Sequence, residues 1–303
     1  MMNKGTARKG LLLFVVFVGL STVVGLSRLM DSHRPALDAQ IEEEQLYING
    51  QTVKRISLGF NGLAADWYWM RSLQYVGRKV LNSPRNIQLD DLGPLNVKLL
   101  APLLDTATTL DPEFMEPYEY AAVVLPGVNV EDAIRIARKG IAANPSSWRL
   151  YQHLGYIYWQ QKDFKAASEA YGEGALLSGA PHWMEAMKAQ MLVEGGSRST
   201  ARQIYERMYQ ETDDPNVREM ARKRLLQIQS FEDRDMIRRI LGEYAGHEQG
   251  CASSWKDVSN ALRRAGLSLD ASGAPLDPTN TPYRMVQTGC DVDLDLRSEV
   301  PQK

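Results

Sequence analysis

The longest apolar run in the chain lies near its start. Gly10 to Ser27 form an uncharged stretch that follows Lys4, Arg8 and Lys9. As an α-helix this stretch is about 27 Å long, close to the hydrocarbon thickness of a bilayer. Basic residues ahead of such a run keep the N-terminus in the cytoplasm. The pattern predicts three segments: a cytoplasmic tail over residues 1–9, a transmembrane signal-anchor over residues 10–27 and a linker over residues 28–45.

The expected topology is a single pass through the inner (cytoplasmic) membrane, with the bulk of the chain periplasmic or otherwise extracytoplasmic. A cleavable secretory signal peptide has the same basic start and apolar core, and it is the alternative. Its cleavage site needs small residues, for which Val23 and Gly25 are the candidates. Both interpretations place the soluble part outside the cytoplasm.

A short β-prone segment follows the linker. Within Leu46 to Ile56, the dipeptide Asn49-Gly50 separates two such runs, as in a hairpin with a two-residue type I′ turn. We expect this hairpin to open the soluble domain, which is predicted to be helical over the rest of residues 46–266.

Helical spacing then continues from Leu58 to about Gly266, interrupted by proline and glycine turn signals. Ala133, Ala167 and Ala201 stand 34 residues apart, which is the period of a helix-turn-helix repeat. Two further sets of positions recur in the same phase: Gly140 with Gly174, and Ala137 with Tyr171 and Tyr205. The fold class predicted from this phase is a mainly α solenoid of stacked helix pairs.

The clearest unit lies between Pro145 and Pro181. Its residues follow the tetratricopeptide repeat position by position: Tyr151, Leu154, Gly155 and Tyr158 on the first helix, and Phe164, Ala167, Tyr171 and Gly174 on the second. This unit resembles that family closely. Small residues such as Gly155 and Ala167 allow a close helix crossing, and the aromatic residues fill the space where the helices diverge.

A more divergent unit pairs Phe60–Gly77 with Leu95–Asp111. After the repeats, three separate helices are expected over Asn216–Gln229, Phe231–His247 and Ser253–Ala265. The remaining residues, 267–303, are predicted to be an extended tail with strands near Tyr283–Val286 and Asp291–Leu294 around a Thr288-Gly289 turn. We expect this hairpin and the N-terminal one to form a single small sheet, because each is too short to be stable alone. A disordered acidic C-terminus is the alternative.

Three stretches together resemble a group of exported, membrane-anchored bacterial tetratricopeptide proteins of undefined role. They are SLGFNGLAADWYWMRSLQYVG, the Leu110–Pro112 tripeptide and the tail motif DPTNTPY followed by Thr-Gly. The resemblance covers most of the exported part and implies no enzymatic activity.

The densest aromatic stretch of the chain runs from Asp66 to Arg71. The helix that carries it is either buried between neighbouring elements or presents an aromatic patch to a partner. The candidate partner-binding residues are Asp66, Trp67, Trp69, Arg71, Tyr151 and Tyr158.

Charge and cysteine content narrow the classes of function. The chain has 35 basic and 37 acidic residues, which argues against a nucleic-acid partner. The interleaved charges over 198–239 are typical of a solvated helix surface. Cys251 and Cys290 could form one disulfide in an oxidising compartment or remain free.

No motif predicts a metal, a cofactor or a catalytic centre. The four histidines are scattered, and the Gly172-Glu173-Gly174 stretch lacks the spacing of a phosphate loop. The sequence therefore favours a scaffold or assembly factor that binds protein partners in the cell envelope. The alternatives are a structural subunit of a membrane complex and an accessory domain of an envelope enzyme, with Asp66 or Asp111 as acid or base.

Overall fold

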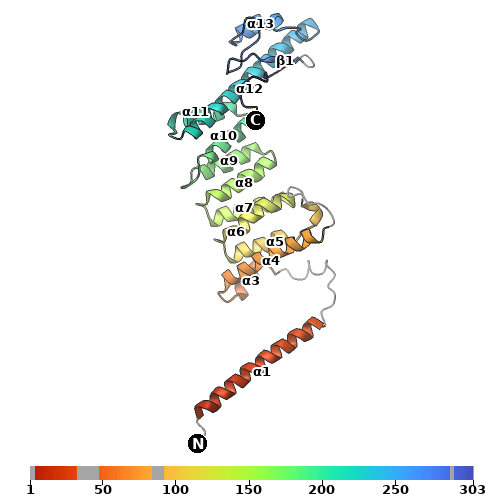
Figure 1. Cartoon of the computed structure of the whole chain (residues 1–303), viewed down its shortest axis with the longest axis vertical. Coiled ribbons are helices and arrows are strands. Elements are labelled where there is room, and N and C mark those ends of the chain that lie inside the picture. The colour runs from red at the N-terminus through yellow and green to blue at the C-terminus, as the bar shows by residue number, and fades with distance from the viewer. Residues whose placement is uncertain (1–3, 33–47, 84–91, 287–289, 303) are drawn as a thin grey trace.

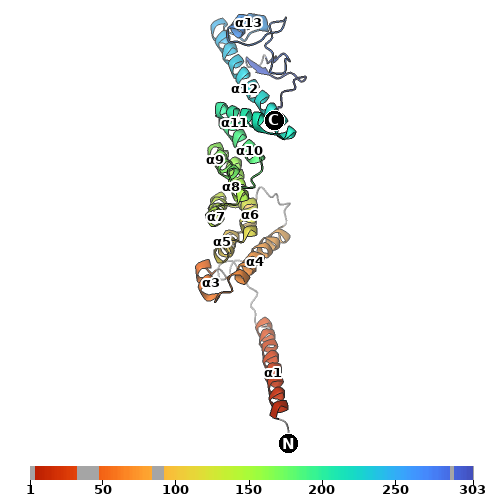
Figure 2. The same cartoon turned by 90° about the vertical axis from the view of Figure 1, so that its left-hand side faces the viewer.

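The protein is described here from a computed structural model, which covers residues 4–32, 48–83, 92–286 and 290–302. Within the first helix, side chains are described for residue 14 and for residues 16–29. The chain is mainly α-helical and elongated, with the elements following one another along the long axis (Figure 1, Figure 2).

Helix α1 (Lys4–Ser32) stands apart from the other helices in both views (Figure 1, Figure 2). Among the residues whose side chains are described, no helix combines the length and the hydropathy that a bilayer span requires. Residues 10–13 and 15 of the predicted anchor lie outside that set, as do residues 33–45 of the predicted linker.

The central part is a stack of helical hairpins, in which each helix packs mainly on its neighbours along the chain. A short helix, α3 (Gly50–Ile56), packs on α5 at the start of the stack. The paired helices are α4 (Asn61–Leu81) with α5 (Leu100–Leu110), α6 (Met115–Val124) with α7 (Val130–Ala143), α8 (Trp148–Gln160) with α9 (Phe164–Ala175), and α10 (Trp183–Glu194) with α11 (Arg198–Glu211). Two short 3₁₀ turns, η1 (Gly93–Leu95) and η2 (Leu125–Gly127), lie before α5 and after α6.

The 34-residue phase corresponds to the closest contacts in this stack. Ala133, Ala167 and Ala201 are all fully buried. A Cβ atom added to Gly155 of α8 would lie 2.8 Å from the Tyr171 ring on α9. The helices therefore cross where the sequence places its small residues, which confirms the prediction of a helical array.

Side-chain caps set the start of several helices. Asp163 accepts a hydrogen bond from the Ala166 amide at 3.0 Å at the start of α9, and Asn129 does the same for the Asp132 amide of α7. These caps satisfy amides that have no partner inside the helix.

The predicted N-terminal β-hairpin is wrong. Gly50–Ile56 is helix α3, and Asn49 caps it by accepting a hydrogen bond from the Gln51 amide at 2.9 Å. Asparagine followed by glycine suits a helix start as well as a type I′ turn, and here the packing of Gly50 against α5 selects the helix start. Gly50 lies so close to α5 that an added Cβ would be 3.0 Å from the Thr109 Cβ. Leu46 and Tyr47 lie outside the described residues.

The helices predicted over Asn216–Gln229 and Phe231–His247 are one continuous helix, α12 (Pro215–Glu248). No proline or glycine interrupts its sequence before Gly242. Ser230, at the predicted break, is instead fully buried, and its hydroxyl accepts a hydrogen bond from the Tyr283 hydroxyl at 3.1 Å. Helix α13 (Trp255–Arg264) follows, with a capping box formed by Ser254 and Asp257.

The C-terminal tail folds back on α12. Strands β1 (Arg284–Val286) and β2 (Asp291–Asp293) pair antiparallel with Met285 opposite Val292, close to the predicted positions. The expected joint sheet with the N-terminal end is wrong, because that end is helical and β2 packs on α12. The predicted Thr288-Gly289 turn lies outside the described residues.

Two consecutive seven-residue turns precede β1. Leu269–Pro275 and Leu276–Pro282 have the same Leu-Asp start and proline end, and each is closed by a bridge between its end residues. Asp270 accepts hydrogen bonds from the amides of Ser272 and Ala274, and Asp277 accepts them from the amides of Thr279 and Thr281. These turns give the tail a defined path without regular secondary structure.

Candidate functional site

The candidate residues on α4 divide between the surface and the interior. Trp67 is 54% exposed, and the Arg71 guanidinium lies 5.1 Å from its ring centroid. Asp66 is also exposed. The Trp69 ring instead packs edge-to-face on Phe114 and Tyr120, with centroid distances of 6.2 and 5.3 Å. Trp69 therefore belongs to the packing between α4 and α6.

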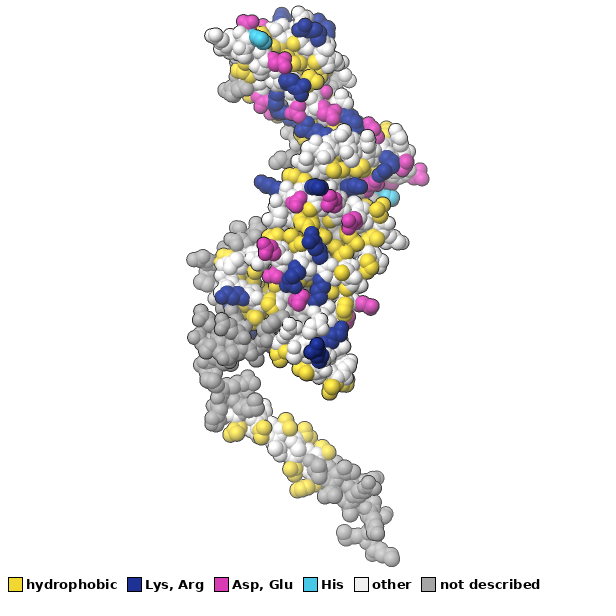
Figure 3. Space-filling model, turned by 180° about the vertical axis from the view of Figure 1, so that it is seen from behind, with side chains coloured by type: hydrophobic (Ala, Val, Ile, Leu, Met, Phe, Trp, Pro, Cys, Tyr) yellow, Lys and Arg dark blue, Asp and Glu magenta, His cyan; other side chains and the backbone are white. Residues whose placement is uncertain are grey.

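Tyr151 and Tyr158 lie on α8, several helices away from the α4 residues. Tyr151 is half-buried beside Gly174, and the Tyr158 hydroxyl accepts a hydrogen bond from Arg138 Nη2 at 2.7 Å. Apart from Trp69, the candidate residues thus belong to two separate surfaces. Figure 3 shows that hydrophobic side chains gather over the middle of the array on the face seen there.

Aromatic rings make up much of the surface near α8. Trp148 packs edge-to-face on Trp183 of α10 at 6.0 Å, and Tyr156 packs on Trp159 at 5.9 Å. Amphipathic rings of this kind are enriched where proteins bind other proteins.

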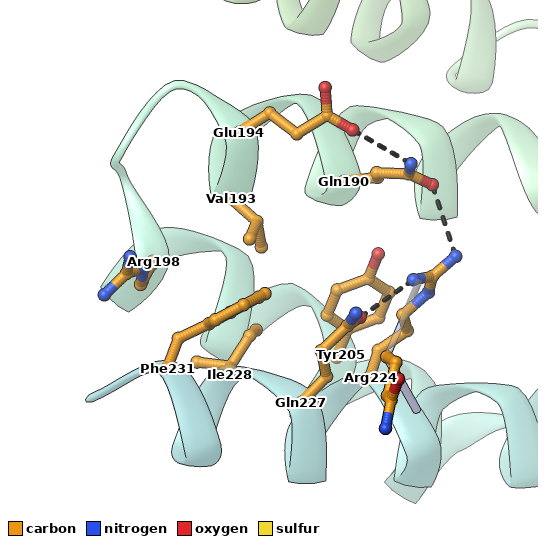
Figure 4. Close-up of a pocket in the computed structure, with 10 residues that line it drawn as sticks. Gln190, Val193, Glu194, Arg198, Tyr205, Arg224, Gln227, Ile228 and Phe231 are labelled. Atoms are coloured by element: carbon orange, nitrogen blue, oxygen red, sulfur yellow. Dashed lines mark hydrogen bonds between the residues drawn. The ribbon is translucent and has the colours of Figure 1, made fainter. Parts of the chain in front are cut away.

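A cavity of about 540 Å³ lies next to this aromatic surface, between α10, α11 and α12 (Figure 4). We refer to it as the α10–α12 cavity. Its apolar lining comes from Val193, Ile228 and Phe231, together with the Tyr205 ring. Its polar lining comes from Gln190, Glu194, Arg198, Arg224, Gln227 and Gln302. The lining thus combines apolar surface with polar and charged side chains.

A chain of hydrogen bonds connects the cavity to α8. Trp159 Nε1 donates to Glu194 Oε2 at 3.2 Å, and Gln190 Nε2 donates to Glu194 Oε1 at 3.0 Å. Arg224 continues the chain, since its Nη2 donates to Gln190 Oε1 at 3.4 Å and its Nη1 to Gln227 Oε1 at 2.8 Å (Figure 4). Side chains of α8, α10 and α12 are therefore held in one network.

The opposite end of the cavity carries a second arginine. Arg198 pairs with Asp235 and lies 5.2 Å from the Phe231 ring centroid. Burial raises the pKa of Asp235, but the hydrogen bond and charge of Arg198, followed by those of Arg238, hold that pKa below its usual value. Arg198 Nε is buried and has no hydrogen-bond partner among the described residues.

Tyr205 forms part of the cavity wall. Its hydroxyl donates to the Ala186 carbonyl oxygen at 3.0 Å, and burial raises its pKa to about 12 against the opposing charge of Arg224. The phenol is therefore a neutral, fixed part of the wall at physiological pH.

The end of the chain reaches this region. Val300 is buried, Pro301 lies beside Met220 and Lys223 of α12, and Gln302 lines the α10–α12 cavity. The C-terminus accordingly lies beside α10 in Figure 1, far from the α13 end of the molecule. A polypeptide segment without regular secondary structure therefore already lies along this part of the surface.

Asp66 and Asp111, the carboxylates of the enzyme alternative, have environments that are common for aspartates on a helix surface and at a helix end. Asp111 ends α5 and accepts a hydrogen bond from the Glu113 amide at 3.1 Å, and Asp66 is on the exposed side of α4. In the described ranges, no group of three or more histidine, cysteine, aspartate or glutamate residues is arranged to hold a metal ion.

Cys251 and Cys290 form a disulfide, with Cα atoms 5.1 Å apart. The bond joins the segment between α12 and α13 to the residue immediately before β2. It fixes the tail where the tail returns along α12.

Comparison with known proteins gives no assignment: no protein-family model matches this sequence, and no curated protein matches it significantly.

Sequence reasoning did not identify the α10–α12 cavity. Gln190, Arg198, Arg224 and Phe231 come from three helices, and no local spacing relates them. The charged stretch over 198–239 was predicted to be a solvated surface, which describes most of its side chains but not Arg198 and Arg224.

Proposed function

We propose that this protein is a membrane-anchored scaffold or assembly factor of the cell envelope, built on tetratricopeptide-like repeats, and that it binds a protein partner at the α10–α12 cavity. The observation that carries the proposal is this cavity, whose network joins α8, α10 and α12 across successive hairpins. Stacked repeats produce extended surfaces of this kind, which bind proteins more often than small molecules.

Support for the tetratricopeptide assignment comes from the positions of its small and large residues. Ala133, Ala167 and Ala201 are buried at equivalent places, and Gly155 contacts Tyr171 as the repeat requires. From α6 to α11 the helices are also short, with 10 to 14 residues each, as expected for 34-residue units.

Support for the anchor comes from the sequence and from α1. Between Val16 and Ser27 this helix carries no charged residue, and its large apolar side chains there, among them Val16, Phe17 and Val18, are exposed. Three basic residues precede the apolar run. The Cys251–Cys290 disulfide agrees with a location outside the cytoplasm, where such bonds persist.

The cavity favours a peptide segment with apolar and acidic side chains. Phe231 and Ile228 offer apolar contact, while Arg198 and Arg224 offer hydrogen bonds to carboxylates or backbone carbonyls. The chain's own Pro301 and Gln302 already lie beside this region, which supports a polypeptide as the occupant.

The test is co-purification of partners with the full chain from detergent-solubilised membranes. Val193→Arg places a long cation in the cavity and is expected to remove the partner. Leu176→Arg is the matched control, because Leu176 is 87% exposed and lies outside the cavity. A partner that is retained equally by both variants would show that binding occurs elsewhere.

A further inference from the structure

The N-terminal end of the array carries a concentrated group of exposed apolar side chains. Between residues 56 and 70 these are Ile56, Leu58, Phe60, Leu63, Trp67 and Met70, all more than half exposed. We call this set the end face. Solenoids normally cover their terminal repeats with polar residues, so an apolar end requires an explanation.

The end face occupies the side of α4 that points away from the stack. Ala65, Tyr68, Ser72 and Tyr75 are buried on the inner side of this helix. Leu63, Trp67 and Met70 each lie two residues from one of these positions, about 200° around the helix axis. The outer side of α4 is therefore a continuous apolar stripe, with no helix of the described stack packed over it.

Leu58 lies exposed in the turn before α4. Leu58 has a φ of 49° and is followed by Gly59 at 93°, so both residues are left-handed. A leucine in this region costs about 1–2 kcal/mol, and at 86% exposure its side chain recovers little of that by packing inside the chain. A strained, exposed apolar residue suggests a contact outside the molecule.

Basic side chains surround the end face. Residues 48–83 contain five basic residues and one acidic residue, although the net charge of the whole chain is −2. Lys54 and Arg55 lie exposed on α3, and Arg71 lies over the Trp67 ring. Figure 3 shows dark blue side chains beside yellow ones at the lower end of the array. Apolar side chains with Lys and Arg beside them are typical of helices that lie in a membrane interface.

The end face also lies close along the chain to α1, the proposed membrane anchor. Residues 33–47 separate α1 from the described start of the array, and this end of the array is the one toward α1 (Figure 1). Fifteen residues span at most about 50 Å. If α1 crosses a bilayer, the end face is confined to a thin layer next to that bilayer, at a high effective concentration.

We propose that the end face docks on the anionic headgroup region of the bilayer, with Leu58, Phe60 and Leu63 inserted among the lipids and the basic residues at the phosphates. The proposal rests on the proposed anchor only for the location of the bilayer. A second copy of the chain fits the end face less well, because each face has five basic residues against one acidic residue and two such faces would repel each other.

The test uses the full chain reconstituted in vesicles of phosphatidylcholine, with or without phosphatidylglycerol. Both native cysteines are in the disulfide, so Leu58→Cys supplies a single free thiol for an environment-sensitive fluorophore. Leu176→Cys is the matched control, since Leu176 is 87% exposed and lies on α9's C-terminal end. We expect lipid-borne quenchers to reduce the emission at position 58 and not at position 176, more strongly with phosphatidylglycerol present.

A second variant tests the charge contribution. Lys54→Gln combined with Arg55→Gln is expected to weaken docking by about fivefold for each residue removed. Quenching at position 58 should then approach that of the phosphatidylcholine vesicles.

Two outcomes would overturn the proposal. The label at position 58 could be as accessible to aqueous iodide as the label at position 176. Alternatively, it could be shielded from iodide without lipid quenching, which would indicate a second copy or a protein partner. Resistance of α1 to alkaline extraction is measured separately and tests the anchor. If the anchor fails, protein added to preformed vesicles still reports docking of the end face through the label at position 58. Failure of the anchor and failure of docking are therefore distinguished.

Discussion

At the C-terminal end of the array the chain folds back over its last long helix, whereas at the N-terminal end it leaves large apolar side chains exposed. Tyr283, Val292 and Leu294 of the tail are buried against the α12 region, and a disulfide holds the tail there. Leu58 and Phe60, at the other end, have little cover. Every stacked array leaves an apolar surface at each end, and in the described parts of the chain only the C-terminal end is covered by the chain's own residues.

This difference between the two ends of the array indicates a separate role for each end. The covered end is stable in water and brings the C-terminal residues to the α10–α12 cavity. The exposed end is the one next to α1, where a bilayer is the proposed cover. The comparison therefore predicts that changes at the C-terminal end lower stability, while changes at the N-terminal end alter docking more than folding.

Truncation after Gly273 should have the largest effect. It removes Tyr283, Val292 and Leu294, each of which contributes about 1.5–3 kcal/mol by burial. We expect the second half of α12 to become sensitive to limited proteolysis while α4–α9 stay resistant. If the truncated chain keeps full protease resistance, the tail is not a cover and the comparison of the two ends fails.

Loss of the disulfide is the next largest change. Cys251 and Cys290 are 39 residues apart in sequence. Closing a loop of this length stabilises the folded state by about 3 to 4 kcal/mol in the chain-entropy model. The double variant Cys251→Ser, Cys290→Ser should lower the free energy of unfolding of the C-terminal part, measured in urea, by that amount. The same variant with no change in hydrogen exchange around β2 would contradict the structural role of the bond.

Leu58→Asn should raise the free energy of unfolding, whereas the two preceding changes lower it. Asparagine tolerates left-handed backbone better than leucine, and little buried contact is lost at this position. The free energy of unfolding should rise by up to about 1 kcal/mol. Leu176→Asn serves as the control, because Leu176 is equally exposed and has a right-handed backbone, with φ −81°. An equal response of the two variants would remove the argument from strain.

Acidification should have the smallest effect on the free energy of unfolding, and this effect should arise at the C-terminal end. A hydrogen bond from Arg238 lowers the pKa of Asp291, and Arg238 also pairs with Asp235 on α12. Because the folded-state pKa lies below the unfolded value of about 3.9, this contribution is present above that pH and is lost as the pH falls further. Urea unfolding at pH 7 and pH 3 measures the loss, which Arg238→Gln should reduce. These side chains are almost half exposed, so screening keeps the effect small.

The helical array was predictable because its signal is repeated. The alanines 34 residues apart mark close helix crossings, and each crossing depends on residues near in sequence, such as Gly155 and Tyr171. The two strands of the tail were also predictable from their turn and β-prone residues.

The errors arose where distant contacts decide between two local possibilities. Asn49-Gly50 suits a hairpin turn and a helix start, and packing of Gly50 against α5 selects the helix. Ser230 suits a helix end, yet its hydrogen bond with Tyr283 keeps it inside α12. The α10–α12 cavity was not predictable for the same reason, since Arg198 and Arg224 line one cavity only after the hairpins stack.

The most direct test of the account is site-specific photo-cross-linking of the full chain in native membranes, with a photoreactive residue at position 193, 58, 176 or 296. Val193 lines the α10–α12 cavity, Leu58 lies on the end face, and Leu176 and Leu296 are exposed controls. We predict a discrete protein adduct from position 193, lipid adducts from position 58 and neither from the controls. A protein adduct that forms at position 176 as readily as at position 193 would contradict the assignment of the cavity as the partner-binding site.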